Sequence, residues 1–179
     1  MSLSYALLAL LLDCPSSGYE LNKAFEGSIG CFWKASHQQI YRELGKLEEL
    51  GWVNVQLVPQ AGKPDKKIYS VNELGRSQLT AWTARPADIT PIKEEILIKL
   101  FVGTLVEPHV LQSHIQQHRQ DYEALLAAYE TIAAKWFPAP QNLPVEDHLR
   151  YLTLRCGMRY ATSWIDWCDE VLAYLATLN

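Results

Sequence analysis

The chain has 179 residues, of which 49% are hydrophobic and 20% are charged, and its formal net charge is −4. This composition is typical of a globular protein with one or two modest cores. No window reaches the roughly 18 uninterrupted apolar residues of a membrane span. The apolar run 7–12 also lacks the basic region and the cleavage site of a secretory signal. We therefore expect a cytoplasmic protein with no membrane partner.

The negative charge belongs to the second half of the chain. Residues 1–85 hold nine Lys and Arg against eight Asp and Glu, whereas residues 86–179 hold seven against twelve. A nearly neutral first half does not exclude a nucleic-acid partner, because the local field at a binding surface matters more than the whole-chain sum. It predicts modest non-specific affinity that falls strongly as salt rises.

A helix is predicted from Ser36 to Leu50. Ser36 and Gln39 fit a capping box, in which each side chain accepts a hydrogen bond from an orphan backbone N–H. Gly51 suits the left-handed position that ends a helix. The apolar residues that should face the core at helical spacing are Ile40, Leu44, Leu47 and Leu50. Those that should point outward are Gln38, Gln39, Arg42 and Lys46.

The outward face of this helix is polarised along its axis, with amides and Arg42 near its start and Glu43, Glu48 and Glu49 further on. Glutamine can contact adenine and arginine can contact guanine through paired hydrogen bonds, and recognition helices read base edges with their N-terminal residues. An ordinary amphipathic surface helix would show the same polar face. The segment that follows favours DNA reading.

Two runs after the helix, 52–58 and 67–71, alternate apolar and polar residues, which predicts a β-hairpin. The loop between them carries Lys63, Lys66 and Lys67 against one acid, Asp65. Such a tip can straddle a phosphate backbone, although a merely solvated lysine loop would look alike. The predicted DNA-contacting residues are Ser36, His37, Gln38, Gln39, Tyr41, Arg42, Lys46, Lys63, Lys66 and Lys67.

The rest of the chain is predicted to be helical, so the fold class is mainly α with a small β-hairpin. We expect a winged helix-turn-helix domain over 1–85, a linker and linker helix over 86–106, and a helical dimerisation and effector domain over 107–179. Thr90 can cap a helix with Pro91 at its first position, and Glu107 and Pro108 begin another that runs to Trp136. Prolines over 138–144 then separate it from a last helix of about thirty residues.

The last predicted helix carries a stripe of apolar or large residues every three or four positions. A stripe of this length needs a partner, either the preceding helix of the same chain or a second subunit. We favour a subunit interface, because one short neighbouring helix would not cover it. The predicted homodimer interface consists of Leu149, Leu152, Trp164, Trp167, Val171, Tyr174 and Leu178.

An effector site is a further hypothesis. Aromatic side chains could line a pocket for a small molecule, and two arginines one turn apart could bind its carboxylate. The residues concerned are Trp33, Tyr151, Arg155, Arg159, Tyr160 and Trp164. A core of aromatics with arginines in surface ion pairs explains the same pattern.

Metal, redox and catalytic chemistry receive less support. The cysteines, which lack CxxC spacing, are Cys14, Cys31, Cys156 and Cys168. We interpret them as reduced core residues, with a thiol redox sensor as the alternative. His114 and His118 lie one turn apart, as metal ligands can, but lack the glutamate of a zincin motif and fit solvated histidines as well. With no phosphate loop, GxSxG or HExxH motif, we expect no enzyme, no cofactor and no metal.

Several segments together carry a family resemblance, namely 7–12, 17–21, 32–33, 36–50, 62–71, 72–75, 91–101 and 155–160. They resemble the PadR-type winged-helix transcriptional regulators, in the branch with a long helical C-terminal dimerisation region. The resemblance implies a homodimer that binds an inverted-repeat operator in double-stranded DNA, commonly as a repressor, and that an effector releases. In this family the β-hairpin, here 52–71, is called the wing. It has lysines where relatives often have arginine, which keeps the positive charge but loses the planar guanidinium that can bind a phosphate through two hydrogen bonds. The alternative is a winged-helix module that binds proteins.

Overall fold

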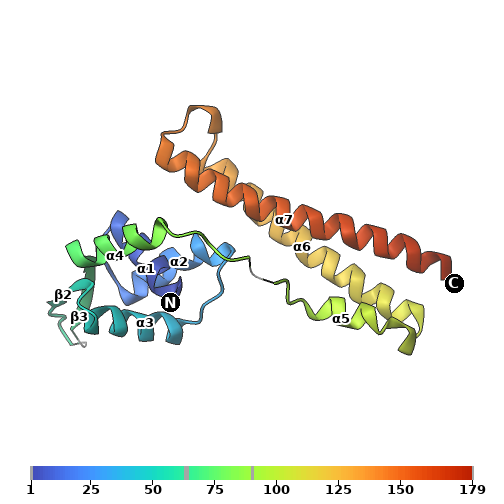
Figure 1. Ribbon diagram of the computed structural model, residues 1–179, viewed down its shortest axis with the longest axis horizontal. Helices are drawn as coiled ribbons and strands as arrows, with labels where there is room; N and C mark the ends of the chain where they lie inside the picture. Colours follow the sequence, from blue (N-terminus) through green and yellow to red (C-terminus); the bar gives the residue numbers. More distant parts are fainter. Residues whose placement is uncertain (1, 63–64, 90, 179) are drawn as a thin grey trace. The chain divides into compact units, whose positions relative to one another are not determined.

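The structure is a computed structural model that describes residues 2–62, 65–89 and 91–178. The chain divides into two compact units, Met1–Ile89 and Thr90–Asn179 (Figure 1). In the first unit the helices are α1 (Ser2–Asp13), α2 (Gly18–Glu26), the 3-10 turn η1 (Ile29–Cys31), α3 (His37–Glu49) and α4 (Glu73–Thr83). Its strands are β1 (Ser16–Ser17), β2 (Val53–Val58) and β3 (Lys66–Val71).

The three strands form an antiparallel sheet in the order β1-β3-β2. Val53 pairs with Val71 at the base of the β2–β3 hairpin, and Val58 pairs with Lys66 near its tip. The hairpin predicted from alternating residues is therefore present. One core, built from the three helices α1 to α3 with the hairpin and α4, includes Leu7, Leu8, Leu11, Leu21, Phe25, Ile40, Leu44, Leu47 and Tyr69.

Helix α3 begins and ends as the sequence predicts. Ser36 caps it in a complete capping box with Gln39, and Gly51 follows it with a φ of 66°. Ile40, Leu44 and Leu47 are fully buried, but Leu50 is 45% exposed, which corrects its assignment to the core. Leu50 is the C-cap, so it lies beyond the last helical turn that faces α1.

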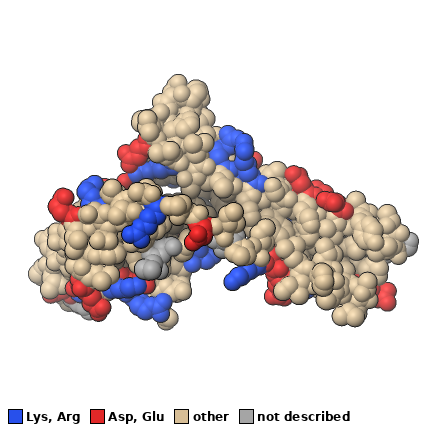
Figure 2. Space-filling model, in the orientation of Figure 1, with Lys and Arg blue, Asp and Glu red and all other residues tan. Residues whose placement is uncertain are grey.

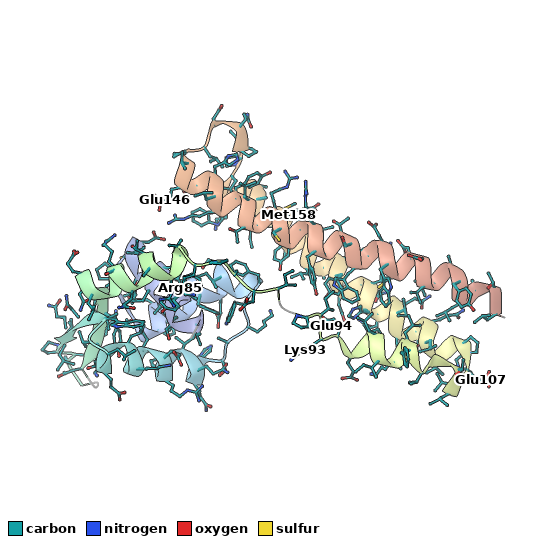
Figure 3. All side chains as sticks on the ribbon, viewed as in Figure 1. Arg85, Lys93, Glu94, Glu107, Glu146 and Met158 are labelled. Carbon is teal, nitrogen blue, oxygen red and sulfur yellow. The ribbon has the colours of Figure 1, made fainter. Side chains whose placement is uncertain are left out.

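The second unit is a helical hairpin with one short helix beside it (Figure 1). Its elements are α5 (Glu95–Phe101), η2 (Gly103–Leu105), α6 (Pro108–Trp136), η3 (Pro140–Asn142), α7 (Val145–Leu175) and η4 (Ala176–Leu178). Helix α6 starts at Pro108 and ends at Trp136 as predicted, and Glu107 and Glu146 mark the starts of α6 and α7 in Figure 3. No helix of the described residues has the length and apolarity needed to cross a membrane.

The linker helix starts later than predicted. Helix α5 begins at Glu95, and Glu94 at its N-cap has an extended backbone with φ −112° and ψ 121°. Pro91 therefore precedes the helix instead of occupying its first position, and Thr90, the predicted cap, lies outside the described residues. The local sequence misleads because Thr-Pro is a common helix start, whereas Glu94 makes no side-chain cap bond.

Part of the apolar stripe of α7 is buried against other helices of the same chain, and part of it is exposed at the surface. Ile96 and Ile115, on α5 and α6, share a core with Trp164, Cys168, Val171 and Leu175. Trp164 and Val171 are thus buried within one chain, which corrects their place in the predicted subunit interface; Trp167 is half-buried. The interface residues that stay exposed are Leu149, Leu152, Tyr174 and Leu178.

Candidate nucleic-acid interface

The first turn of α3 holds its polar side chains in two different ways. The Ser36 hydroxyl accepts a hydrogen bond from the Gln39 backbone N–H at 3.2 Å, and the Gln39 side-chain oxygen accepts one from the Ser36 N–H at 2.8 Å. The Gln39 amide oxygen is therefore occupied by the cap, so a paired contact to adenine would require breaking the capping box. Gln38 lies exposed beside it.

His37 is tied to α2 instead of projecting freely. Its Nε2 lies 3.0 Å from Oε1 of Glu26 and 3.0 Å from Nδ2 of Asn22. One nitrogen cannot donate to the carboxylate and accept from the amide at the same time, so the tautomer of the His37 ring decides which hydrogen bond forms. The hydrogen bond from His37, followed by that from Asn22, lowers the pKa of Glu26.

Among the residues predicted to contact bases, Arg42 has the side chain that is most available for such a contact. It is exposed on the outer face of α3, and no side chain in the described part of the molecule pairs with it. Lys46, one turn further on, lies 3.6 Å from Glu43. Tyr41 is half exposed and packs against the start of α2, where a Cβ on Gly18 would lie 2.4 Å from its ring.

Glu43 has a structural role that the sequence analysis missed. Its carboxylate accepts a hydrogen bond from the buried Ser4 hydroxyl of α1, which is the main reason that its pKa is lowered. Only 14% of the Glu43 side chain is exposed. The pair fixes the rotation of α3 on α1, and with it the direction in which Arg42 points. A serine in an otherwise apolar helix start was the available sequence signal.

The described wing lysines both form ion pairs with carboxylates of the first unit. Nζ of Lys66 lies 2.8 Å from Glu20, and Nζ of Lys67 lies 2.8 Å from Glu48. Lys63, the third predicted cation of the loop, lies outside the described residues. Figure 2 shows basic and acidic side chains close together over the first unit. The positive charge predicted for the wing is therefore partly offset.

Glu20 joins the wing to the start of α2. It accepts hydrogen bonds from the Ser17 backbone N–H at 2.9 Å and from Lys66 at 2.8 Å. The Lys66 bond, followed by those from Ser17, lowers the pKa of Glu20 to about 2. Its stabilising contribution is thus complete above the ordinary carboxyl pKa and is lost as pH falls toward 2.

We expect Glu20→Gln to lower the free energy of unfolding at neutral pH, because glutamine keeps the shape but loses the charge that holds Lys66. The difference from the wild type should shrink below pH 4.5, the ordinary value, and vanish near pH 2. Urea denaturation at a series of pH values measures it. A difference that stays constant down to pH 2 would contradict this role.

In the second unit, a shallow hollow of about 320 Å³ lies between α5 and α7. Its lining is almost entirely apolar and consists of Ile92, Leu97, Tyr160, Ser163, Trp164 and Trp167. Below it, Trp164 stacks on Tyr122 with ring centroids 5.5 Å apart. The Tyr160 hydroxyl donates to Glu94 at 3.4 Å, and Glu94 is labelled in Figure 3 ahead of α5.

Of the six predicted effector residues, five lie in the second unit, and these five do not all line the hollow. Tyr160 and Trp164 line the hollow, but Tyr151 lies further toward the start of α7, under the Arg155 guanidinium at 5.9 Å. Arg159 is exposed and does not line the hollow. Trp33 belongs to the first unit. The described hollow thus offers a surface for an aromatic ring but no arginine for its carboxylate.

Both halves of the chain match known families. Residues 7–81 match the family described as "Transcriptional regulator PadR-like family", and residues 92–176 match "Virulence activator alpha C-term". A probable transcriptional regulator of Mycobacterium tuberculosis is 37% identical, over 96% of each chain. This chain belongs to the PadR-like family of transcriptional regulators.

Solved structures are similar to this PadR-like protein over almost its whole length. The Vibrio cholerae virulence activator AphA shares 33% sequence identity over 99% of each chain, with a TM-score of 0.80. Bacillus subtilis PadR in complex with operator DNA shares 27% identity over 98% of this chain and 99% of that one, with a TM-score of 0.83. The same PadR has been solved with p-coumaric acid, at 26% identity, matching coverage and a TM-score of 0.81. The family and the relative from Mycobacterium tuberculosis are both described as transcriptional regulators.

The burial of the cysteines in this PadR-like protein differs from that expected from the sequence. Cys168 is buried in the second core, where desolvation raises the pKa of its thiol, but Cys14 and Cys156 are exposed. These two occupy a helix end and an outer helix face, so the assignment of all cysteines to the core was wrong. The Cys31 side chain lies outside the described set.

The two histidines on α6 have different surroundings. His114 is exposed, whereas His118 is half-buried with its ring edge-on to Tyr122 and Trp164 at 5.0 and 5.3 Å. Among residues 2–62, 65–89 and 91–178, no group of three or more metal-ligating side chains is assembled. His118 therefore belongs to the aromatic cluster of the second unit.

Proposed function

We propose that this PadR-like regulator acts in the cytoplasm as a homodimeric repressor that binds an inverted-repeat operator and is released by a small-molecule effector. The carrying observation is the exposed start of α3, where Gln38 and Arg42 project and Arg42 pairs with none of the described residues. The capping box and the Ser4–Glu43 hydrogen bond hold this helix in place. Recognition helices enter the major groove with such residues. The operator complex of Bacillus subtilis PadR supports the same use of the fold.

Exposed apolar side chains of the second unit support a homodimer. Leu149 and Leu152 lie exposed near the start of α7, and Phe101 at the end of α5 and Leu105 in η2 are 91% and 80% exposed. Exposed groups of large apolar side chains often mark an interface. A two-fold dimer would place two copies of α3 about 34 Å apart, the spacing of successive major grooves on one face of DNA.

The hollow over Trp164 supports an effector with a flat apolar ring, and the p-coumaric acid complex of Bacillus subtilis PadR supports an aromatic acid. Arg155 and Arg159, which lie one turn apart on α7 and outside the lining of the hollow, remain the proposed carboxylate partners. Calorimetric titration with hydroxycinnamic and benzoic acids tests this part. Absence of heat with every acid would overturn it without affecting the DNA proposal.

Fluorescence anisotropy of the purified protein on a duplex from its own promoter, with excess competitor DNA, tests the proposal as a whole. We expect specific binding of two chains per operator, weakened as salt rises because phosphate contacts release counterions. No binding at any salt concentration would favour a protein-binding role for the winged helix.

Arg42→Ala should weaken operator binding by about 1–3 kcal/mol and relax the preference at one base position, because it removes a side chain placed to contact a guanine edge. Anisotropy on a set of operator duplexes with single base changes measures both effects. Arg76→Ala, which removes an exposed arginine from α4, is the matched control and should leave the base preference unchanged. Equal behaviour of the two variants would place Arg42 outside the interface.

A further inference from the structure

The wing lysine Lys67 is engaged before any DNA arrives. Its Nζ donates to both carboxylate oxygens of Glu48, at 2.8 and 3.0 Å. We propose that Glu48 limits the affinity of this protein for DNA by competing with backbone phosphates for Lys67. This inference rests on the proposed DNA-binding function and assigns one residue that tunes it.

Backbone structure on both sides fixes the pair. Glu48 lies in the last turn of α3, and Lys67 lies in β3 opposite Leu57 of β2. The hairpin register therefore places this lysine over the end of the recognition helix. Glu48 also raises the pKa of Lys67, in agreement with a persistent contact.

The pair remains open to a competing anion. Side-chain exposure is 46% for Lys67 and 38% for Glu48, so a phosphate can reach the ammonium without unfolding the wing. Exposed ion pairs of this kind are weak in water. Glu48 thus reduces the contribution of Lys67 to phosphate binding without abolishing it, and it adds a repelling charge at the same place.

Lys66 repeats the arrangement with Glu20, but Glu20 also closes the capping box of α2. Removing Glu20 would disturb the start of that helix, whereas the Glu48 carboxylate makes no other hydrogen bond or ion pair within the described segments. Replacement of Glu48 therefore tests the competition between carboxylate and phosphate without disturbing a helix cap. Both described lysines of the wing are paired with carboxylates. The effect of this pairing on DNA affinity is best measured at Lys67.

The test measures binding of the full chain to a mixed-sequence duplex over a series of salt concentrations. Glu48→Gln keeps the shape and removes the charge. We expect tighter binding at low salt and a steeper salt dependence, with the slope of log K against log salt increased by up to about 0.9, one phosphate contact. Between 50 and 200 mM salt the advantage over the wild type should then shrink about three-fold.

Two controls separate this competition from a general loss of negative charge. Glu49→Gln removes the same charge from an exposed neighbour that pairs with no described residue, and it should leave the slope unchanged. Lys67→Gln should cost more affinity in the Glu48→Gln background than in the wild type, because Lys67 is then free to bind phosphate. Thermal melts confirm that each variant is folded.

Equal gains from Glu48→Gln and Glu49→Gln, or a gain that Lys67→Gln does not cancel, would overturn the inference while the DNA-binding function stands. Absence of DNA binding by the wild type and by Glu48→Gln alike would overturn both. A steeper slope that requires Lys67 supports the inference.

Discussion

Replacing Gly75 by alanine should lower the free energy of unfolding of the first unit by about 3 kcal/mol. Gly75 is the third residue of α4, and a Cβ there would lie 2.1 Å from the Trp52 carbonyl oxygen and 3.1 Å from a Val71 methyl group. The Trp52 oxygen belongs to the backbone and accepts a hydrogen bond from the Asn72 N–H. Relief of the clash would therefore displace α4 from the base of the hairpin. Urea denaturation followed by circular dichroism measures the loss.

Gly45→Ala is the matched control for this substitution. Gly45 lies within α3, and a Cβ there meets nothing within 4 Å. Because alanine restricts the unfolded chain and favours the helix, this variant should gain about 0.5–1 kcal/mol. The two glycine variants should thus shift the unfolding midpoint in opposite directions. Destabilisation by both would show that the close approach at Gly75 is not the cause.

Trp164→Ala should lower the free energy of unfolding of the second unit by about 3–5 kcal/mol, since it empties the centre of the aromatic cluster. Trp164 is 7% exposed, stacks on Tyr122 and meets Trp167 edge-on at 5.1 Å. The change would also remove the floor of the hollow proposed for the effector. Urea denaturation followed in the near-ultraviolet, where the packed aromatics give a signal, measures it.

Trp136→Ala is the matched control for Trp164→Ala. Trp136 ends α6 and is 63% exposed, and the Lys135 ammonium lies 4.9 Å from its ring centroid. Its truncation should change stability by less than about 0.5 kcal/mol, as exposed substitutions usually do. A cost similar to that of Trp164→Ala would mean that burial within this chain does not explain the aromatic cluster.

The sequence predicts those parts of the fold that depend on local chemistry. The Ser36–Gln39 box, Gly51 after α3, the alternating residues of the hairpin and Pro108 at the start of α6 each involve neighbours in the chain, and each is confirmed. The fold class and the PadR-like family follow from their order and are confirmed as well.

Contacts between distant residues could not be read from the sequence. Lys67 and Glu48 are far enough apart in the chain that only the hairpin register brings them together, and Ser4 meets Glu43 only because α1 crosses α3. Helical spacing also could not tell which residues of the α7 stripe its own chain covers. It placed Trp164 and Leu149 on one stripe, and the structure buries the first and exposes the second.

The two-residue strand β1 links the wing to the helix-turn-helix. Ser17 pairs with Ile68 of β3 and, as the N-cap, also starts α2. Strand β3 lies between β1 and β2, so it cannot swing outward without pulling on Ser17. If the wing contacts a phosphate backbone as proposed, a force on β3 would therefore be transmitted to the first turn of α2, and through Gly18 and Tyr41 to α3. The proposed recognition helix and the wing would then respond to bound DNA together.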